Sequence, residues 1–276
     1  MGLFDQDLIK TIVVPEPNYG QVLTIDHLYY TSRSICDKVT NLNNLDQAES
    51  EALYSFYEYN LSGDGLVRFI PTLLCRKGVA VEMSIQEVSF SGFDNPVDPY
   101  TKVDGSTVVL GEYIKDASCN ERIILYVKNI RAAAKEHKIA SSLLLNAVLA
   151  HELYHAFFHK DKYAPEIEEP LAEFGSLLYM NILRSCKITS YESIESLYHV
   201  IKGKGARNPN LKSYSLGADL FQETIHDPCI RKYIEMYEKF DINRLSFDLA
   251  RQYNQIKDNP SVSNMKNLIN GIMKEY

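Results

Sequence analysis

The segment His151-Glu152-Leu153-Tyr154-His155 constrains this chain of 276 residues more than any other part of its sequence. It has the form HExxH, and apolar residues precede it at helical spacing, because Leu144, Ala147 and Val148 lie seven, four and three positions before the first histidine. This spacing predicts a helix on which the histidines continue an apolar stripe. Since a buried imidazole needs partners for its nitrogen atoms, the stripe requires either polar neighbours or a metal ion.

The spacing of the two histidines favours the metal ion. Positions i and i+4 lie on one face of an α-helix, so the imidazoles of His151 and His155 can reach a single ion. Glu152 projects about 100° around the helix, which places its carboxylate beside the metal rather than on it. Zinc suits such nitrogen and oxygen ligands, and in a catalytic site three protein ligands leave one position for water. Glu152 could then take a proton from that water as a general base. Two core histidines without a metal are the alternative.

Two acidic residues further along the chain compete for the place of the third ligand. Glu169 and Glu173 follow the second histidine by 14 and 18 positions and, four residues apart on a continuous helix, share one face. Pro170 is well placed at the first turn of that helix, which would put Glu169 near its start and favours Glu169 as the ligand. Glu173 would then accept a hydrogen bond from a ligand imidazole, because metal-bound histidines usually donate their other N–H group. The competing assignment, with Glu173 as the ligand, stays open.

Through these motifs the chain resembles the gluzincins, the thermolysin-like zinc peptidases. In that family a second helix follows the HExxH helix and carries a glutamate ligand, often in an ExxAD pattern, to which Glu169-x-x-Ala172-Glu173 is similar except for its final Glu. The resemblance covers roughly residues 120 to 185. It implies a zincin-like fold and an edge strand that aligns the substrate, with Arg122–Val127 as its counterpart. It also implies a histidine that stabilises the oxyanion, for which His199 and His226 are candidates.

Hydrophobic periodicity predicts an α+β fold. We expect residues 1–129 to form N-terminal helices and a small β-sheet, which the resemblance implies is mixed. Residues 130–276 form a mostly helical half that carries HExxH and the third-ligand helix. The two parts together form one compact catalytic unit. The predicted strands are Leu66–Cys75, Val79–Ser89, Ser106–Tyr113 and Arg122–Val127. The predicted helices are Thr24–Leu42, Leu45–Tyr59, Ile130–His137, Ser142–Lys160, Pro170–Ser185, Tyr191–Ile201, Leu216–Ile225, Ile230–Lys239 and two near the C-terminus. Asn95–Pro99 and Gly203–Pro209 are predicted breaks.

The composition argues against several other classes of protein. The 29 basic and 36 acidic side chains form no basic stripe, so we expect no nucleic-acid partner. No run of about 18 apolar residues predicts a membrane span, and the first residues lack the features of a signal peptide. The five cysteines are scattered without a CxxC pair, which favours reduced thiols and a cytoplasmic location.

The sequence therefore predicts a zinc metallopeptidase that acts on a peptide or protein substrate and binds one zinc ion per chain. His151, His155 and Glu169 would hold the metal, and Glu152 would be the general base. The alternative is a zincin-like metal-binding protein with a binding or regulatory role and little or no hydrolysis. Glu152 favours the enzyme, because a structural zinc site has no use for a base and normally closes with four protein ligands. Cleavage specificity and oligomeric state are left open.

Overall fold

The computed structural model describes residues 39–61, 79–91, 97–118, 120–158, 165–185 and 191–224, with isolated positions between 261 and 271. The described residues form six α-helices and a five-stranded mixed sheet, which confirms the α+β prediction. The helices are α3 (Gln47–Leu61), α5 (Val127–His137), α6 (Ser141–Phe158), α7 (Pro165–Ser185), α8 (Tyr191–Arg207) and α9 (Lys212–Thr224). The strands are β1 (Val39–Thr40), β2 (Ala80–Ser84), β3 (Val97–Thr101), β4 (Thr107–Lys115) and β5 (Glu121–Tyr126).

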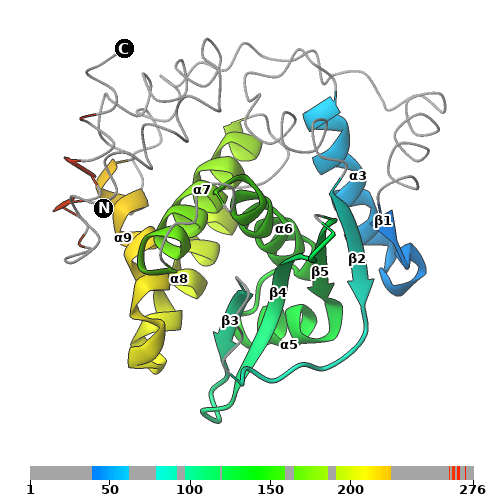
Figure 1. Cartoon of the computed structure of the whole chain (residues 1–276), viewed down its shortest axis with the longest axis horizontal. Helices are drawn as coiled ribbons and strands as arrows, with labels where there is room; N and C mark the ends of the chain where they lie inside the picture. The colour runs from blue at the N-terminus through cyan, green and yellow to red at the C-terminus, as the bar shows by residue number, and fades with distance from the viewer. Residues whose placement is uncertain are drawn as a thin grey trace.

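The sheet has the strand order β1-β2-β5-β4-β3 (Figure 1). The first three strands are parallel, whereas β4 pairs antiparallel with both β5 and β3. The prediction that Arg122–Val127 is an edge strand is wrong, because β5 has a partner on each side: Ile123 pairs with Val81 and with Tyr113. The edge strand nearest α8 is β3.

Strand β3 was predicted as a loop because two prolines flank Val97 and Asp98. Proline removes a hydrogen-bond donor, but an edge strand tolerates this loss. The pairing register also shifts within this strand: Asp98 lies opposite Gly111 and Pro99 opposite Val109, so Leu110 of β4 has no partner. Such a β-bulge changes the direction in which the following side chains point. Gly111 consequently faces α6, where an added Cβ would lie only 2.7 Å from Val148 Cγ1.

Helix α6 lies at the centre of the molecule, with the sheet on one side and helices on the others (Figure 1). It packs against β3, β4 and β5, and against α3, α5 and α7. One apolar cluster joins all of these elements, and its fully buried members include Leu53, Leu110, Tyr113, Leu125, Ile130, Leu149 and Leu177. No helix in the described part of the chain is long and apolar enough to cross a membrane.

Helices α7 and α8 extend furthest beyond their predicted bounds. Helix α7 begins at Pro165, so this proline rather than Pro170 occupies the first turn, and Pro170 lies inside the helix. Helix α8 continues through Gly203-Lys204-Gly205 to Arg207, although this segment was predicted as a break. Glycine weakens a helix by about 1 kcal/mol, but tertiary contacts override so small a preference. Here Lys204 is buried between two carboxylates, which fixes the helix at this position.

The predicted helix Leu45–Tyr59 is confirmed as α3, whereas the predicted helix Thr24–Leu42 is wrong where it can be compared. Val39 and Thr40, expected at the end of a helix, form β1 and pair in parallel with Val81 and Glu82 of β2. Their β-branched side chains suit a strand. The predicted elements Leu66–Cys75 and Ile230–Lys239, the two C-terminal helices and residues 24–38 lie outside the described residues, apart from the isolated positions near the C-terminus.

Helix α3 begins with a reciprocal cap that also ties it to α5. Asp46 accepts a hydrogen bond from the backbone N–H of Glu49 (2.9 Å), and Glu49 accepts one from the N–H of Asp46 (3.0 Å). The Glu49 carboxylate also receives two hydrogen bonds from Arg131, of 2.9 and 2.6 Å. Burial alone would raise the pKa of Glu49, but the hydrogen bonds from Arg131 and Asp46 lower it below its usual 4.5.

The Glu49→Gln substitution should therefore lower the free energy of unfolding at pH 7 by about 1–2 kcal/mol, because it weakens the cap and the partly exposed ion pair. A carboxylate with a depressed pKa stabilises the fold above its unfolded-state pKa and loses this effect as the pH falls through its folded-state value. Urea unfolding of parent and variant should thus differ at pH 7 and converge in acid. Glu51→Gln, at an exposed position of the same helix, is the control. A difference between parent and Glu49→Gln that is independent of pH would contradict the assignment.

Candidate metal centre

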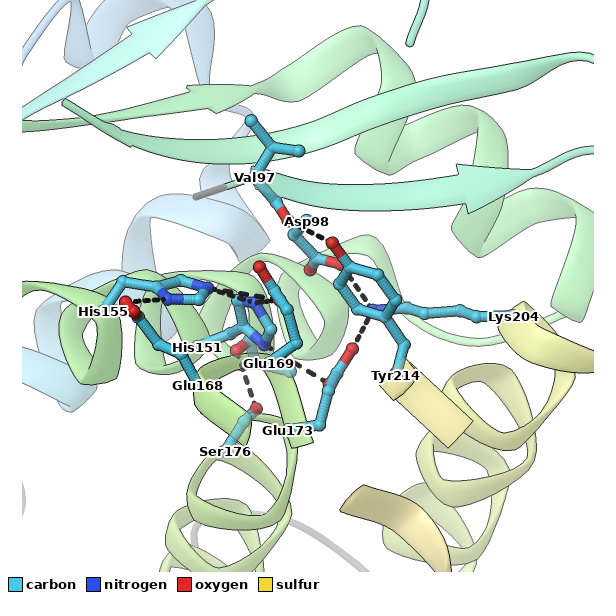
Figure 2. Close-up of polar contacts among 11 residues, drawn as sticks. Val97, Asp98, His151, His155, Glu168, Glu169, Glu173, Ser176, Lys204 and Tyr214 are labelled. Carbon is cyan, nitrogen blue, oxygen red and sulfur yellow. Dashed lines mark hydrogen bonds and ion pairs between the residues drawn. The ribbon is translucent and has the colours of Figure 1, made fainter. Parts of the chain in front are cut away.

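The two histidines of the HExxH motif face each other in the interior (Figure 2). Both belong to α6, both are 0% exposed, and their rings meet edge to face with centroids 4.6 Å apart. Nε2 of His151 lies 2.9 Å from Nε2 of His155. The helical spacing of four residues thus brings one nitrogen atom of each ring to a common point.

A carboxylate from α7 completes a triangle of potential ligand atoms. Oε2 of Glu169 lies 3.4 Å from Nε2 of His151 and 3.4 Å from Nε2 of His155. Ligand atoms at ordinary zinc distances in a tetrahedral site are about 3.3 Å apart, so two edges of the triangle match and the third is somewhat short. This oxygen is buried and has no hydrogen-bond partner among the described residues, which leaves it available to a cation.

The outer nitrogen of each imidazole also faces a carboxylate of α7. Nδ1 of His155 lies 2.9 Å from Oε1 of Glu168, and Nδ1 of His151 lies 3.5 Å from Oε2 of Glu173. A carboxylate at Nδ1 favours the tautomer with the proton on that nitrogen. In that tautomer both Nε2 atoms carry lone pairs that point at each other and at Glu169. The two lone pairs and the Glu169 carboxylate repel one another unless a cation lies beside them.

Close packing of α6 and α7 holds these groups in place. The hydroxyl of Ser176 donates to the backbone carbonyl of Ala147 over 2.8 Å. One residue earlier, Gly175 allows the ring of Tyr154 to lie against the backbone of α7, since an added Cβ would come within 2.3 Å of that ring. The three glutamates on the preceding turns of α7 are therefore brought against the histidine face of α6.

Glu152 lies next to the triangle but is not part of it. Its side chain is 0% exposed, and neither carboxylate oxygen has a hydrogen-bond partner among the described residues. The bulged strand β4 passes directly over it, because a Cβ on Gly111 would lie 3.0 Å from Oε1 of Glu152. Burial raises the pKa of Glu152 to about 8, although the imidazoles of His155 and His151 partly offset this effect. An unpartnered buried carboxylate is costly, so its retention here calls for a reason.

The charges at the centre attract positive charge to the imidazoles. Burial alone would lower the pKa of His151, but the carboxylates of Glu173 and Asp98 raise it to about 10. The pKa of His155 likewise rises well above its usual value, against the effect of burial, because of Glu169 and Glu168. Burial would raise the pKa of Glu169, yet the two imidazoles lower it to about 2. The cluster therefore favours a cation, whether a proton or a metal ion.

A second group of polar side chains lies beside His151, on the side away from His155 (Figure 2). Lys204 of α8 forms ion pairs with Asp98 of β3 and Glu173 of α7, and all three side chains are at most 3% exposed. The ring of Tyr214 of α9 stacks on His151 with a centroid distance of 6.5 Å and an interplanar angle of 20°. The Tyr214 hydroxyl donates to the carbonyl of Val97 over 3.2 Å.

The structure brings five predicted site residues together: His151, Glu152, His155, Glu169 and Glu173. His199 is exposed on α8, and His226 lies outside the described residues, so neither gains support for a role with an oxyanion.

No motif in the sequence predicts a role at the site for four further residues, Glu168, Asp98, Lys204 and Tyr214. Glu168 had one detectable feature, its place beside Glu169 in an acidic run. The other three reach the site from β3, α8 and α9, and no local pattern in the sequence marks them.

Comparisons of this chain with protein-family models, curated protein sequences and solved structures gave no match.

Zinc titrations of substituted chains should separate the roles of the α7 carboxylates. Glu169→Ala should nearly abolish tight zinc binding, because it removes an atom of the triangle. Glu173→Ala and Glu168→Ala should each weaken binding by about 10- to 100-fold, since they remove only a partner of Nδ1. The dissociation constants can be measured in competition with a chromophoric chelator. If Glu173→Ala loses the metal while Glu169→Ala retains it, Glu173 is the ligand and the assignment is wrong.

Proposed function

We propose that this protein is a zinc-dependent metallopeptidase of the gluzincin type, with His151, His155 and Glu169 as metal ligands. The convergence of two Nε2 atoms and one carboxylate oxygen, at separations of 2.9, 3.4 and 3.4 Å, carries the proposal. The donor set is two imidazoles and one carboxylate, which suits zinc better than magnesium or calcium. Three protein ligands, rather than four, are typical of a catalytic zinc site.

The arrangement of the elements supports a zincin-like interpretation. The HExxH helix α6 packs against a mixed sheet, and the remaining described helices after it form the second half of the chain. The third-ligand helix α7 follows α6 directly in the order of the described elements. The edge strand β3 lies close to the centre, because its Asp98 and His151 have potential ligand atoms within 4.8 Å of each other. In this proposal β3, rather than Arg122–Val127, is the edge strand that aligns the substrate.

Glu152 carries the proton transfers in the proposed reaction. Zinc, when bound, supplies Lewis acidity that acidifies water and polarises a carbonyl group. The Glu152 carboxylate accepts a proton from the attacking water, and later gives it to the departing amine. Among the described residues neither oxygen of Glu152 has a hydrogen-bond partner, which supports this role. Glu168 and Glu173 keep the imidazoles oriented with Nε2 towards the metal.

One observation favours a second function for the same centre. His151, Glu152 and His155 are 0% exposed, whereas a peptide substrate must reach the reacting atoms. A metal-binding protein with a binding or regulatory role, and little or no hydrolysis, has no such need. Activity measurements separate the two functions.

The Glu152→Gln substitution should leave zinc binding intact and reduce peptide hydrolysis by about 10² to 10⁴-fold, because an amide of the same size cannot accept the proton. The measurement uses a broad peptide library, followed by rate constants on any peptide that the parent cleaves. Glu223→Gln, at an exposed position of α9, is the matched control and should hydrolyse at the parent's rate.

Two outcomes would contradict the proposal. A Glu152→Gln variant as active as the parent would remove Glu152 from the mechanism. A zinc-loaded parent that cleaves no member of the library would favour the binding or regulatory function.

A further inference from the structure

Lys204 is unusual among the basic residues of this chain. Of the lysines and arginines whose side-chain burial the structure describes, it alone is buried, with a relative exposure of 3%. It lies in the last turn of α8, and its Nζ contacts Oδ1 of Asp98 and Oε1 of Glu173. A buried ion group of this kind seldom stabilises a fold, because the loss of hydration offsets the attraction between the charges. Its presence therefore points to a role in positioning its neighbours more than in overall stability.

The two oxygens of Glu173 connect this ion group with the metal centre. Oε1 contacts the ammonium group of Lys204, while Oε2 lies 3.5 Å from Nδ1 of His151. Nε2 of the same imidazole belongs to the triangle of potential ligand atoms. The contact of Lys204 thus fixes the plane of the carboxylate that faces the outer nitrogen of a ligand (Figure 2).

Tyr214 restricts the same imidazole from another direction. Its ring stacks on His151 and lies beneath Nζ of Lys204, which is 5.8 Å from the ring centroid. Lys204 also joins the edge strand β3 to α7 through Asp98. The ammonium group is therefore the common contact of three elements, β3, α7 and α9, that surround His151.

We propose that Lys204 is a positioning residue of the metal centre. Its contact with Oε1 holds the Glu173 carboxylate so that Oε2 orients the imidazole of His151 towards the zinc ion. The inference rests on the proposed zinc site but adds a residue that does not touch the metal. Without Lys204, the carboxylates of Asp98 and Glu173 would repel each other inside the core, and Glu173 would lose its fixed orientation. The imidazole of His151 would then be free to turn, and the separations among the three potential ligand atoms would no longer be fixed.

The test is a zinc titration of the full chain in competition with a chromophoric chelator. Lys204→Met removes the ammonium group but keeps a side chain of similar length, and should raise the zinc dissociation constant by about 10- to 100-fold. Lys202→Met is the matched control: Lys202 lies two residues away on α8, and its ion pair with Asp219 is partly exposed. It should bind zinc as the parent does.

A double variant separates positioning from simple charge balance. Asp98→Asn combined with Lys204→Met removes one negative and one positive charge, and should unfold at a urea concentration near that of the parent. Its zinc affinity should nevertheless stay as low as that of Lys204→Met, because Glu173 still lacks its partner. This double variant carries the comparison if Lys204→Met alone does not fold. The cobalt(II) complex of the double variant should also have a visible spectrum different from that of the parent's complex, since the ligand geometry has changed.

Two results would overturn the inference; the first leaves the proposed metal site intact, and the second does not. If the parent binds zinc and the double variant binds it equally tightly with an unchanged cobalt spectrum, Lys204 only balances the charge of Asp98. The proposed metal site would then remain. If the parent itself binds no zinc, the metal site is wrong and the inference falls with it.

Discussion

Two imidazole nitrogens that face each other at 2.9 Å in a fully buried site need a positive charge beside them. Carboxylates at both Nδ1 atoms favour protons on the outer nitrogens, which leaves lone pairs on the inner ones. The Glu169 oxygen adds further negative charge at 3.4 Å from each ring. Since burial makes unbalanced charge costly, the centre requires a bound cation or protonated imidazoles. This requirement connects the helix packing, the buried carboxylates and the proposed chemistry.

The surrounding fold brings α7 and β4 close against α6, the helix that carries these two rings. Helix α7 comes close enough to offer its glutamates because Gly175 admits the ring of Tyr154. Strand β4 passes over Glu152 because the bulge at Leu110 turns Gly111, which has no side chain, towards α6. Close packing of this kind excludes water and strengthens the electrostatic interactions within the site. It also places beside the ligand atoms, where a general base would have to lie, the carboxylate of Glu152, which has no hydrogen-bond partner in the part of the chain that the structure describes.

Sequence reasoning succeeded where one helix determined the geometry. The four-residue spacing of His151 and His155 is sufficient to place both rings on one face, and the α+β order followed from the change in periodicity. It failed where distant segments meet. Strand β3 was missed because Pro99 normally breaks a strand, and only its position at the edge of the sheet makes it acceptable. Lys204 was missed because it lies between two glycines, and its helix is maintained by tertiary ion pairs that no local pattern predicts.

The most direct test of the account is the metal content and zinc X-ray absorption spectrum of protein purified without added metal. The account predicts about one zinc ion per chain, bound only by nitrogen and oxygen atoms at about 2.0–2.2 Å, with the outer-shell scattering of two imidazoles. Protein that is folded but contains no zinc, and takes up none on addition, would contradict it. So would a zinc ion bound by sulfur, because the cluster contains no cysteine among its described residues.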